Sequence, residues 1–163
     1  MEYEIKEDFI VPASIQLLFS NRKLEIMKLL SLLQVFSNQS NKQRKVEEIL
    51  FYYSLVNFDL SKLFEENITI KEQRESYPSP NQYFRFQIEI KELLLLMSDL
   101  GFVEINGKLS DKVEDLKVKL LLKGRSFFEA NTSEYLNNLL VEYETMLGKI
   151  VYSVKNVKKI KGE

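Results

Sequence analysis

The stretch from Leu93 to Ala130 decides the fold, and it reads LLLLMSDLGFVEINGKLSDKVEDLKVKLLLKGRSFFEA. Its first residues complete an apolar helical pattern that begins at Phe84 and ends at Leu100. Gly101 follows at the position where a helix commonly closes with a left-handed residue. The stretch therefore predicts a helix whose end leads directly into extended chain.

Two strands and a further helix are predicted after that glycine. Phe102–Ile105 has the composition of a short strand, and Asn106-Gly107 is the strongest short-range signal for a hairpin. Leu116–Leu122 alternates apolar residues with lysines at its start, as a half-buried returning strand does. A helix then opens at Lys123.

The first half of the chain is predicted to be helical. Apolar residues recur at three- and four-residue spacing across Arg22–Phe36 and again across Arg44–Asn57. The polar run Ser37–Gln43 separates these two helices, and a short helix is expected over Leu60–Glu66. Two prolines then mark a loop at 67–82.

A long amphipathic helix is predicted over 132–154, and the lysine-rich tail at 155–163 is expected to fray. The length fits one domain over 1–163, since domains commonly hold about 100–200 residues. Its parts are N-terminal helices at 9–66, the loop at 67–82, and a helix, wing and following helix at 83–131. The expected fold class is mainly α with a small β-hairpin.

The composition excludes several kinds of chemistry. The chain has no cysteine and no histidine, so it holds no disulfide, no thiolate nucleophile, no histidine base and no Cys/His zinc site. The acidic pairs at 47–48 and 65–66 occupy adjacent helical positions and point about 100° apart, so neither pair addresses one metal ion. We therefore expect no enzyme activity, no metal and no cofactor. The alternative is a metal-dependent hydrolase, which would need a cluster of carboxylates that the fold brings together around magnesium or calcium.

Charge and hydropathy indicate a cytoplasmic protein without a membrane contact. Lys and Arg number 23 against 24 Asp and Glu, which gives a net charge of −1 and no general attraction to nucleic acid. Met1–Asp8 lacks the apolar core of a signal peptide. The longest apolar run, Leu93–Met97, is far shorter than the roughly 18 residues that a membrane span needs.

The order of helix, hairpin and helix resembles a winged helix, in which the hairpin is the wing and the helix before it commonly enters DNA. A narrower resemblance covers most of the chain. The opening Phe9-Ile-Val-Pro12, the leucine-rich helix and the aromatic run Ile49–Phe58 before the winged-helix half are similar to the middle components of ABC-three-component systems. The small subunit of Lamassu-type antiphage defence systems is similar as well.

This resemblance implies a non-enzymatic scaffold subunit of an SMC-like complex. Such a subunit would bridge an SMC-like or Rad50-like ATPase and an effector, commonly a nuclease, through protein–protein contacts. The chemistry would then reside in the other chains.

Two groups of residues are candidates for partner contacts, with packing in the core as the alternative for both. The first flanks the proline loop, where exposed aromatics beside arginine are typical of interface anchors. It comprises Tyr77, Tyr83, Phe84, Arg85 and Phe86. The second is an apolar stripe on the C-terminal half of the last helix, comprising Tyr143, Leu147, Ile150, Val151 and Val154.

The alternative function is a winged-helix transcriptional regulator that acts as a dimer. The charge of its DNA-reading helix argues against it, because 87–99 holds one lysine against three acidic residues. Weak phosphate contacts are expected from the cations of the hairpin and its flank, and an ordinary solvated strand face is the other interpretation. These cations are Lys108, Lys117, Lys119 and Arg125.

Overall fold

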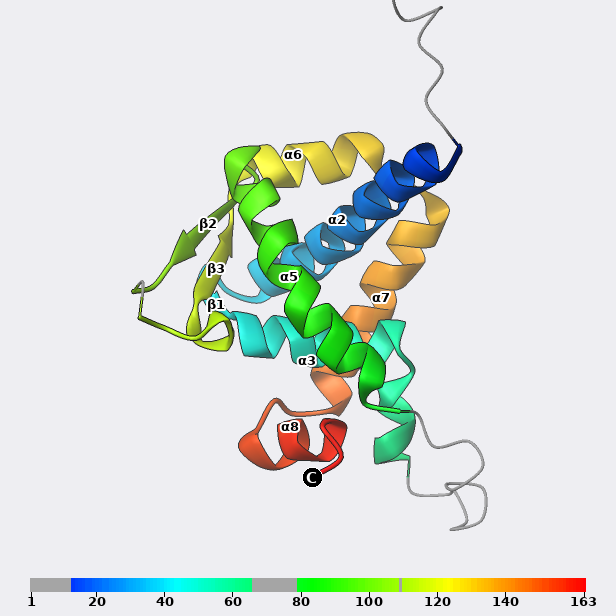
Figure 1. The fold of residues 1–163 in the computed structure, drawn as a ribbon, viewed down its shortest axis with the longest axis vertical. Coiled ribbons are helices and arrows are strands. Elements are labelled where there is room, and N and C mark those ends of the chain that lie inside the picture. Colours follow the sequence, from blue (N-terminus) through cyan, green and yellow to red (C-terminus); the bar gives the residue numbers. More distant parts are fainter. Residues whose placement is uncertain (1–12, 66–78, 109) are drawn as a thin grey trace, which may run out of the picture.

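The computed structural model describes residues 13–65, 79–108 and 110–163. These residues are mainly helical and include a small antiparallel sheet, as the sequence predicts (Figure 1). The helices are α2 (Ala13–Gln39), α3 (Val46–Asn57), α5 (Asn81–Asp99), α6 (Leu122–Asn131), α7 (Glu134–Lys149) and α8 (Val154–Ile160), with 3-10 turns η1 (Leu60–Phe64) and η2 (Val113–Asp115). The strands are β1 (Arg44–Lys45), β2 (Val103–Asn106) and β3 (Lys117–Leu120).

The sheet has the order β1-β3-β2, so the hairpin strand β3 lies in the middle. Val103 pairs with Leu120 across the hairpin, and Arg44 pairs with Val118 on the other side of β3. The backbone N–H of Val46 donates to the carbonyl of Leu116 at 2.8 Å and continues this edge into α3. The sequence predicts that Arg44 lies in a helix. This is wrong, because Arg44 pairs with Val118 at the edge of β3 and forms a short strand.

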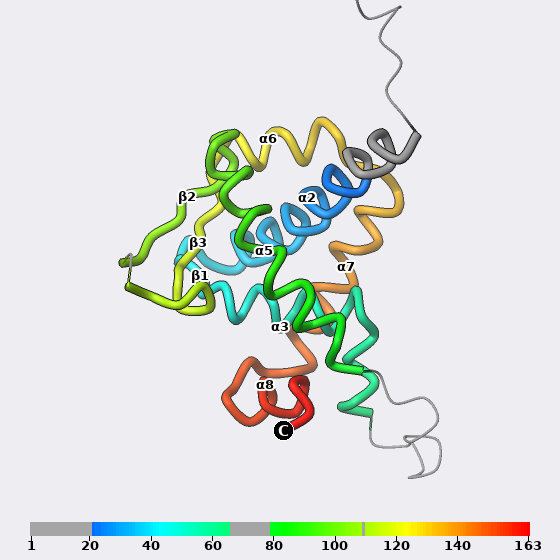
Figure 2. Tube along the Cα trace, in the orientation of Figure 1, coloured from blue at the N-terminus to red at the C-terminus, as the bar shows by residue number. Residues whose placement is uncertain are grey.

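Helix α2 forms the centre of the core. Every residue from Ile26 to Phe36 except Lys28 is buried, so this helix is covered on all sides. Figures 1 and 2 show α2 between α5 on one side and α7 on the other. The structure has one continuous helix from Ala13 to Gln39, where the sequence predicts a helix that begins only at Arg22 and a loop from Ser37.

Helix α5 packs on this core with one of its faces. Its buried residues are Tyr83, Phe86, Ile90, Leu93, Leu94 and Met97, which follow helical spacing. The ring of Phe86 stacks on Tyr53 of α3 with a centroid distance of 4.2 Å. At the end of the helix Gly101 has φ of 77°, and the N–H of Phe102 donates to the carbonyl of Met97, so the predicted glycine cap is confirmed.

The C-terminal region differs from its prediction. Helix α7 ends at Lys149, and Ile150 is extended because its carbonyl accepts a hydrogen bond from Tyr52 Oη at 2.9 Å. The Ser153 hydroxyl then caps α8 by accepting from the N–H of Asn156. One helix over 132–154 and a frayed tail over 155–163 are therefore both wrong. Most of the loop predicted at 67–82 lies outside the described residues, and α5 already begins at Asn81.

Candidate functional site

The exposed side of α5 carries a row of apolar side chains. Phe84 is 39% exposed, Ile88 79% and Leu95 51%. With Lys91 they are spaced by four, three and four residues, so they follow one line along the helix. We call these four residues the α5 stripe.

The α5 stripe is more than scattered surface hydrophobicity. Single exposed apolar residues are ordinary, whereas a row at this spacing is the pattern by which one helix packs against another. The buried face of α5 already supplies its contacts to the core. In the part of the chain that the structure describes, the stripe is thus a second apolar face of α5 with no helix packed on it.

Acidic residues flank the α5 stripe. Glu89, Glu92 and Asp99 are exposed on α5 against the two cations Arg85 and Lys91. Glu92 lies 3.4 Å from the Arg22 guanidinium of α2, and both side chains are well exposed, so this ion pair adds little stability. A helix that enters a DNA groove needs an excess of cations near the phosphates, and α5 does not have it.

A hollow of about 240 Å³ lies next to this helix, between α2, α3 and α5. Its floor includes the stacked rings of Tyr53 and Phe86, and its rim carries Glu25 and Glu89. Partial burial raises the pKa of Glu25, and the nearby Glu89 raises it further. Two cations on the rim, Lys28 and Arg85, balance the two carboxylates, so the hollow favours no ligand charge.

The structure separates the first group of predicted partner residues. Phe84 and Arg85 are exposed, as an interface requires. Tyr83 and Phe86 are buried, at 0% and 4% exposure, so the prediction that they are exposed is wrong. They occupy the inward positions of α5. Tyr77 lies outside the described residues.

The second group is also divided. Tyr143 and Ile150 are buried in the core, and Leu147 is half-buried against it. Tyr143 accepts a hydrogen bond from Asn57 Nδ2 at 2.7 Å, which ties α7 to α3. Val151 and Val154 are exposed, but they lie beyond the end of α7 and do not continue its stripe.

The predicted phosphate contacts fall into three settings. Lys117 and Lys119 are exposed on β3, pointing away from the core. Lys108 is exposed in the connection between β2 and β3. Arg125 is half-buried on α6, where its guanidinium donates to the Ser37 hydroxyl.

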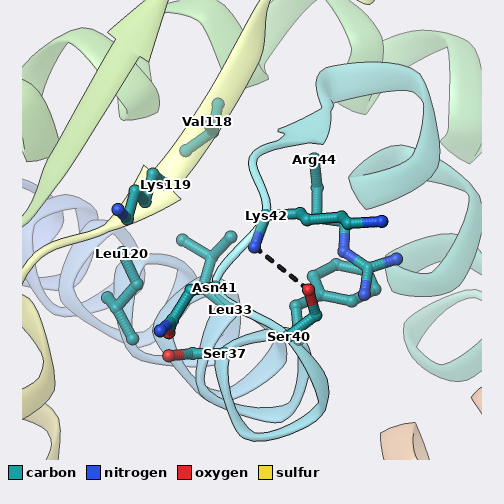
Figure 3. A pocket seen from close by; sticks show the side chains of 10 residues that line it. Leu33, Ser37, Ser40, Asn41, Lys42, Arg44, Val118, Lys119 and Leu120 are labelled. Carbon is teal, nitrogen blue, oxygen red and sulfur yellow. Dashed lines mark hydrogen bonds between the residues drawn. The ribbon is translucent and has the colours of Figure 1, made fainter.

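A small hollow joins β3 to the C-terminal end of α2 (Figure 3). It has room for about 20 Å³, and Lys42 and Lys119 both line it. The Ser40 hydroxyl on its wall accepts the backbone N–H of Lys42 at 3.2 Å. Sequence reasoning missed Lys42 and Lys45 as neighbours of the β3 lysines. No sequence pattern marks β1 as a strand, because two residues are too few to show the alternation of apolar and polar side chains that identifies a strand.

The described residues contain no group of three acidic side chains placed to hold a metal ion. Of the helices that the structure describes, none combines the length and the apolar character needed to cross a bilayer. No protein-family model, no curated protein and no solved structure matches this chain.

Proposed function

We propose that this chain is a non-enzymatic adaptor with a winged-helix-type fold, which docks a partner protein on the α5 stripe. The fold assignment is supported by the element order α2, β1, α3, α5, β2 and β3, together with a sheet in which the first strand lies beside the third. In a winged helix, α5 would be the helix presented to the ligand.

The observation that carries this proposal is the chemistry of the presented helix. The α5 stripe exposes Ile88 and Leu95 between acidic residues. Duplex DNA would repel the acidic residues and would leave the apolar side chains in contact with water. A protein surface would cover the apolar groups and exclude water from them.

The occupant is an amphipathic helix of a second protein. A spacing of four, three and four residues matches the seam of a two-helix coiled coil. Lys91 interrupts the apolar row, and it would pair with an acidic residue of the partner helix, which adds selectivity.

The assembly that we favour is an SMC-like or ABC-type ATPase complex of antiphage defence. The resemblance of the sequence to middle components and to Lamassu small subunits supports this choice. In such an assembly the chain would hold an effector, commonly a nuclease, near a coiled-coil ATPase in the cytoplasm.

The test is an affinity capture at moderate salt from the native host with wild type and with the Ile88→Glu, Leu95→Glu double variant. We expect wild type to recover a large coiled-coil ATPase together with a second protein. The variant should weaken that binding by about 30-fold or more, the effect of losing an interface hot spot. Both positions are exposed, so the variant should fold.

Val141→Glu is the matched control, because Val141 is 57% exposed on α7 and lies outside the α5 stripe. It should bind as wild type does. Equal recovery by all three proteins would contradict docking on α5. Recovery of the chain alone, self-associated and carrying DNA, would instead favour the dimeric transcriptional regulator.

A further inference from the structure

The sheet exposes lysines on the face that points away from the core. Lys45 on β1 is directly opposite Lys117 on β3, so the two side chains lie on the same face. Lys119 follows two residues later on that face, roughly 7 Å along the strand. Val118 between them points inward and is buried, which confirms the alternation.

Lys42 lies just before β1 and lines the same small hollow as Lys119, where α2 ends. Its side chain points toward Arg44 and away from Lys119 (Figure 3), so it does not continue the row. We call Lys45, Lys117 and Lys119 the lysine face. All three are exposed.

The lysine face has an excess of positive charge. Glu104 of β2 is opposite Lys119 and is the acidic residue that shares the face by register. None of the three lysines comes within 4.0 Å of a carboxylate in the described residues. The arginines nearby are already engaged, since Arg44 pairs with Glu48 at 2.9 Å and Arg125 with Ser37.

We infer that the lysine face binds the phosphate backbone of nucleic acid without reading its bases. Three cations spread along two strands fit an extended polyanion, whereas a single phosphate would need them to converge on one point. Lysine is a flexible point charge and lacks the forked geometry with which arginine recognises guanine.

This site differs from the wing tip and from α5. In the β2–β3 connection, Lys108 and Lys112 are balanced by Asp111, Glu114 and Asp115. Asp111 also accepts the backbone N–H of Lys108 at 2.7 Å, which holds its carboxylate inside the loop. The net charge of this connection is therefore unfavourable to phosphate, so we place the phosphate contact on the sheet. This inference does not depend on a partner at the α5 stripe.

The test is fluorescence anisotropy of a labelled 25-base-pair duplex of arbitrary sequence over a series of salt concentrations. Three phosphate contacts predict a slope of log K against log salt of about −2.7. The Lys117→Gln, Lys119→Gln variant should weaken binding for every sequence and reduce the size of the slope by about 2.

Lys155→Gln, Lys158→Gln is the matched control. Both residues are exposed lysines on α8, away from the sheet (Figure 1). This variant should keep the wild-type slope. An equal effect of both variants, or a wild-type slope near zero, would overturn the inference.

Two further measurements distinguish nucleic acid from free phosphate and from lipid headgroups as the ligand of the lysine face. Inorganic phosphate at millimolar concentration should displace the duplex no better than chloride of equal ionic strength. Vesicles with 30% anionic lipid should bind more weakly than the duplex. Displacement by phosphate alone would assign a single-anion site, and preferential vesicle binding would assign a membrane surface, so either result would overturn a nucleic-acid site.

Discussion

At the start of α6 the chain passes so close to Phe102 that only glycine fits. A Cβ atom on Gly124 would lie 2.4 Å from the carbonyl oxygen of Phe102 and 2.9 Å from Leu120 Cδ1. That carbonyl already accepts the N–H of Leu121 at 2.9 Å, so it is held in place. Gly124→Ala should therefore lower the free energy of unfolding by about 1–3 kcal/mol, measured by urea denaturation.

Gly148→Ala is the control for this prediction. Gly148 lies in α7, and an added Cβ meets nothing within 4 Å. Alanine is the better helix former, so this variant should gain about 0.5 kcal/mol. If Gly124→Ala were as stable as Gly148→Ala, the close approach to Phe102 would be wrong.

Single residues are predictable from the sequence where their role is local. The cap at Gly101 depends on neighbours in the chain, and its prediction is confirmed. The cap of α7, where the Ser133 hydroxyl accepts the N–H of Leu136, is equally local. The burial of Tyr83 depends on distant segments, so a sequence pattern cannot specify it. The requirement for glycine at position 124 likewise depends on Phe102, which is distant in the sequence, so a local pattern cannot reveal it.

Helix α8 is an element that the sequence does not reveal. Its residues Val157 and Ile160 are 5% and 1% exposed, although the segment is rich in lysine. The helix lies against η1, and Lys159 Nζ sits 4.8 Å from the ring centroid of Phe64. The buried pair and this contact bind the segment to the rest of the protein.

Ile160→Ala should therefore lower the free energy of unfolding by about 2 kcal/mol, because it leaves a cavity at a position that is 1% exposed. Val154→Ala is the matched control and should change stability by less than about 0.5 kcal/mol, since Val154 is 73% exposed. Thermal unfolding followed by circular dichroism measures both. A frayed C-terminal segment would give the same small change for the two variants.

The boundaries of the elements depend on interactions that periodicity does not contain. Apolar residues continue at helical spacing through 150–154, which predicts an unbroken helix. Helix α7 ends because the Tyr52 hydroxyl donates a hydrogen bond to the carbonyl of Ile150 and Ser153 caps the next helix, α8. The strand β1 likewise exists because β3 offers it an open edge.

The α5 stripe and the lysine face lie on separate elements of one molecule. Substitutions at distant sites without shared partners act independently. A chain with the Ile88→Glu, Leu95→Glu changes should thus keep the wild-type salt slope for duplex DNA. The Lys117→Gln, Lys119→Gln chain should keep wild-type capture of the partner protein. Loss of both activities in either variant, with normal circular dichroism, would show that the two surfaces form one site.

At the scale of the whole molecule, the class of fold follows from the sequence and the arrangement does not. Helical periodicity and the hairpin signal define a mainly α chain with a small sheet. The position of α2 at the centre depends on contacts between segments far apart, such as the bond from the Ser31 hydroxyl to the carbonyl of Leu136, 105 residues away. The α5 stripe was hidden for a related reason, because α5 is apolar on two faces and the sequence does not say which one is buried.

The central position of α2 has a consequence during biosynthesis. This helix packs chiefly against α7, and a ribosome that adds about 5–20 residues per second needs roughly 5–20 s to make the 105 residues from Ser31 to Leu136. Throughout that interval Leu29, Leu30 and Leu32 belong to a nascent chain whose cover has not been synthesised. The helix at the centre of the core is thus the one that waits longest for its neighbour, and the speed of translation sets how long it is open to aggregation.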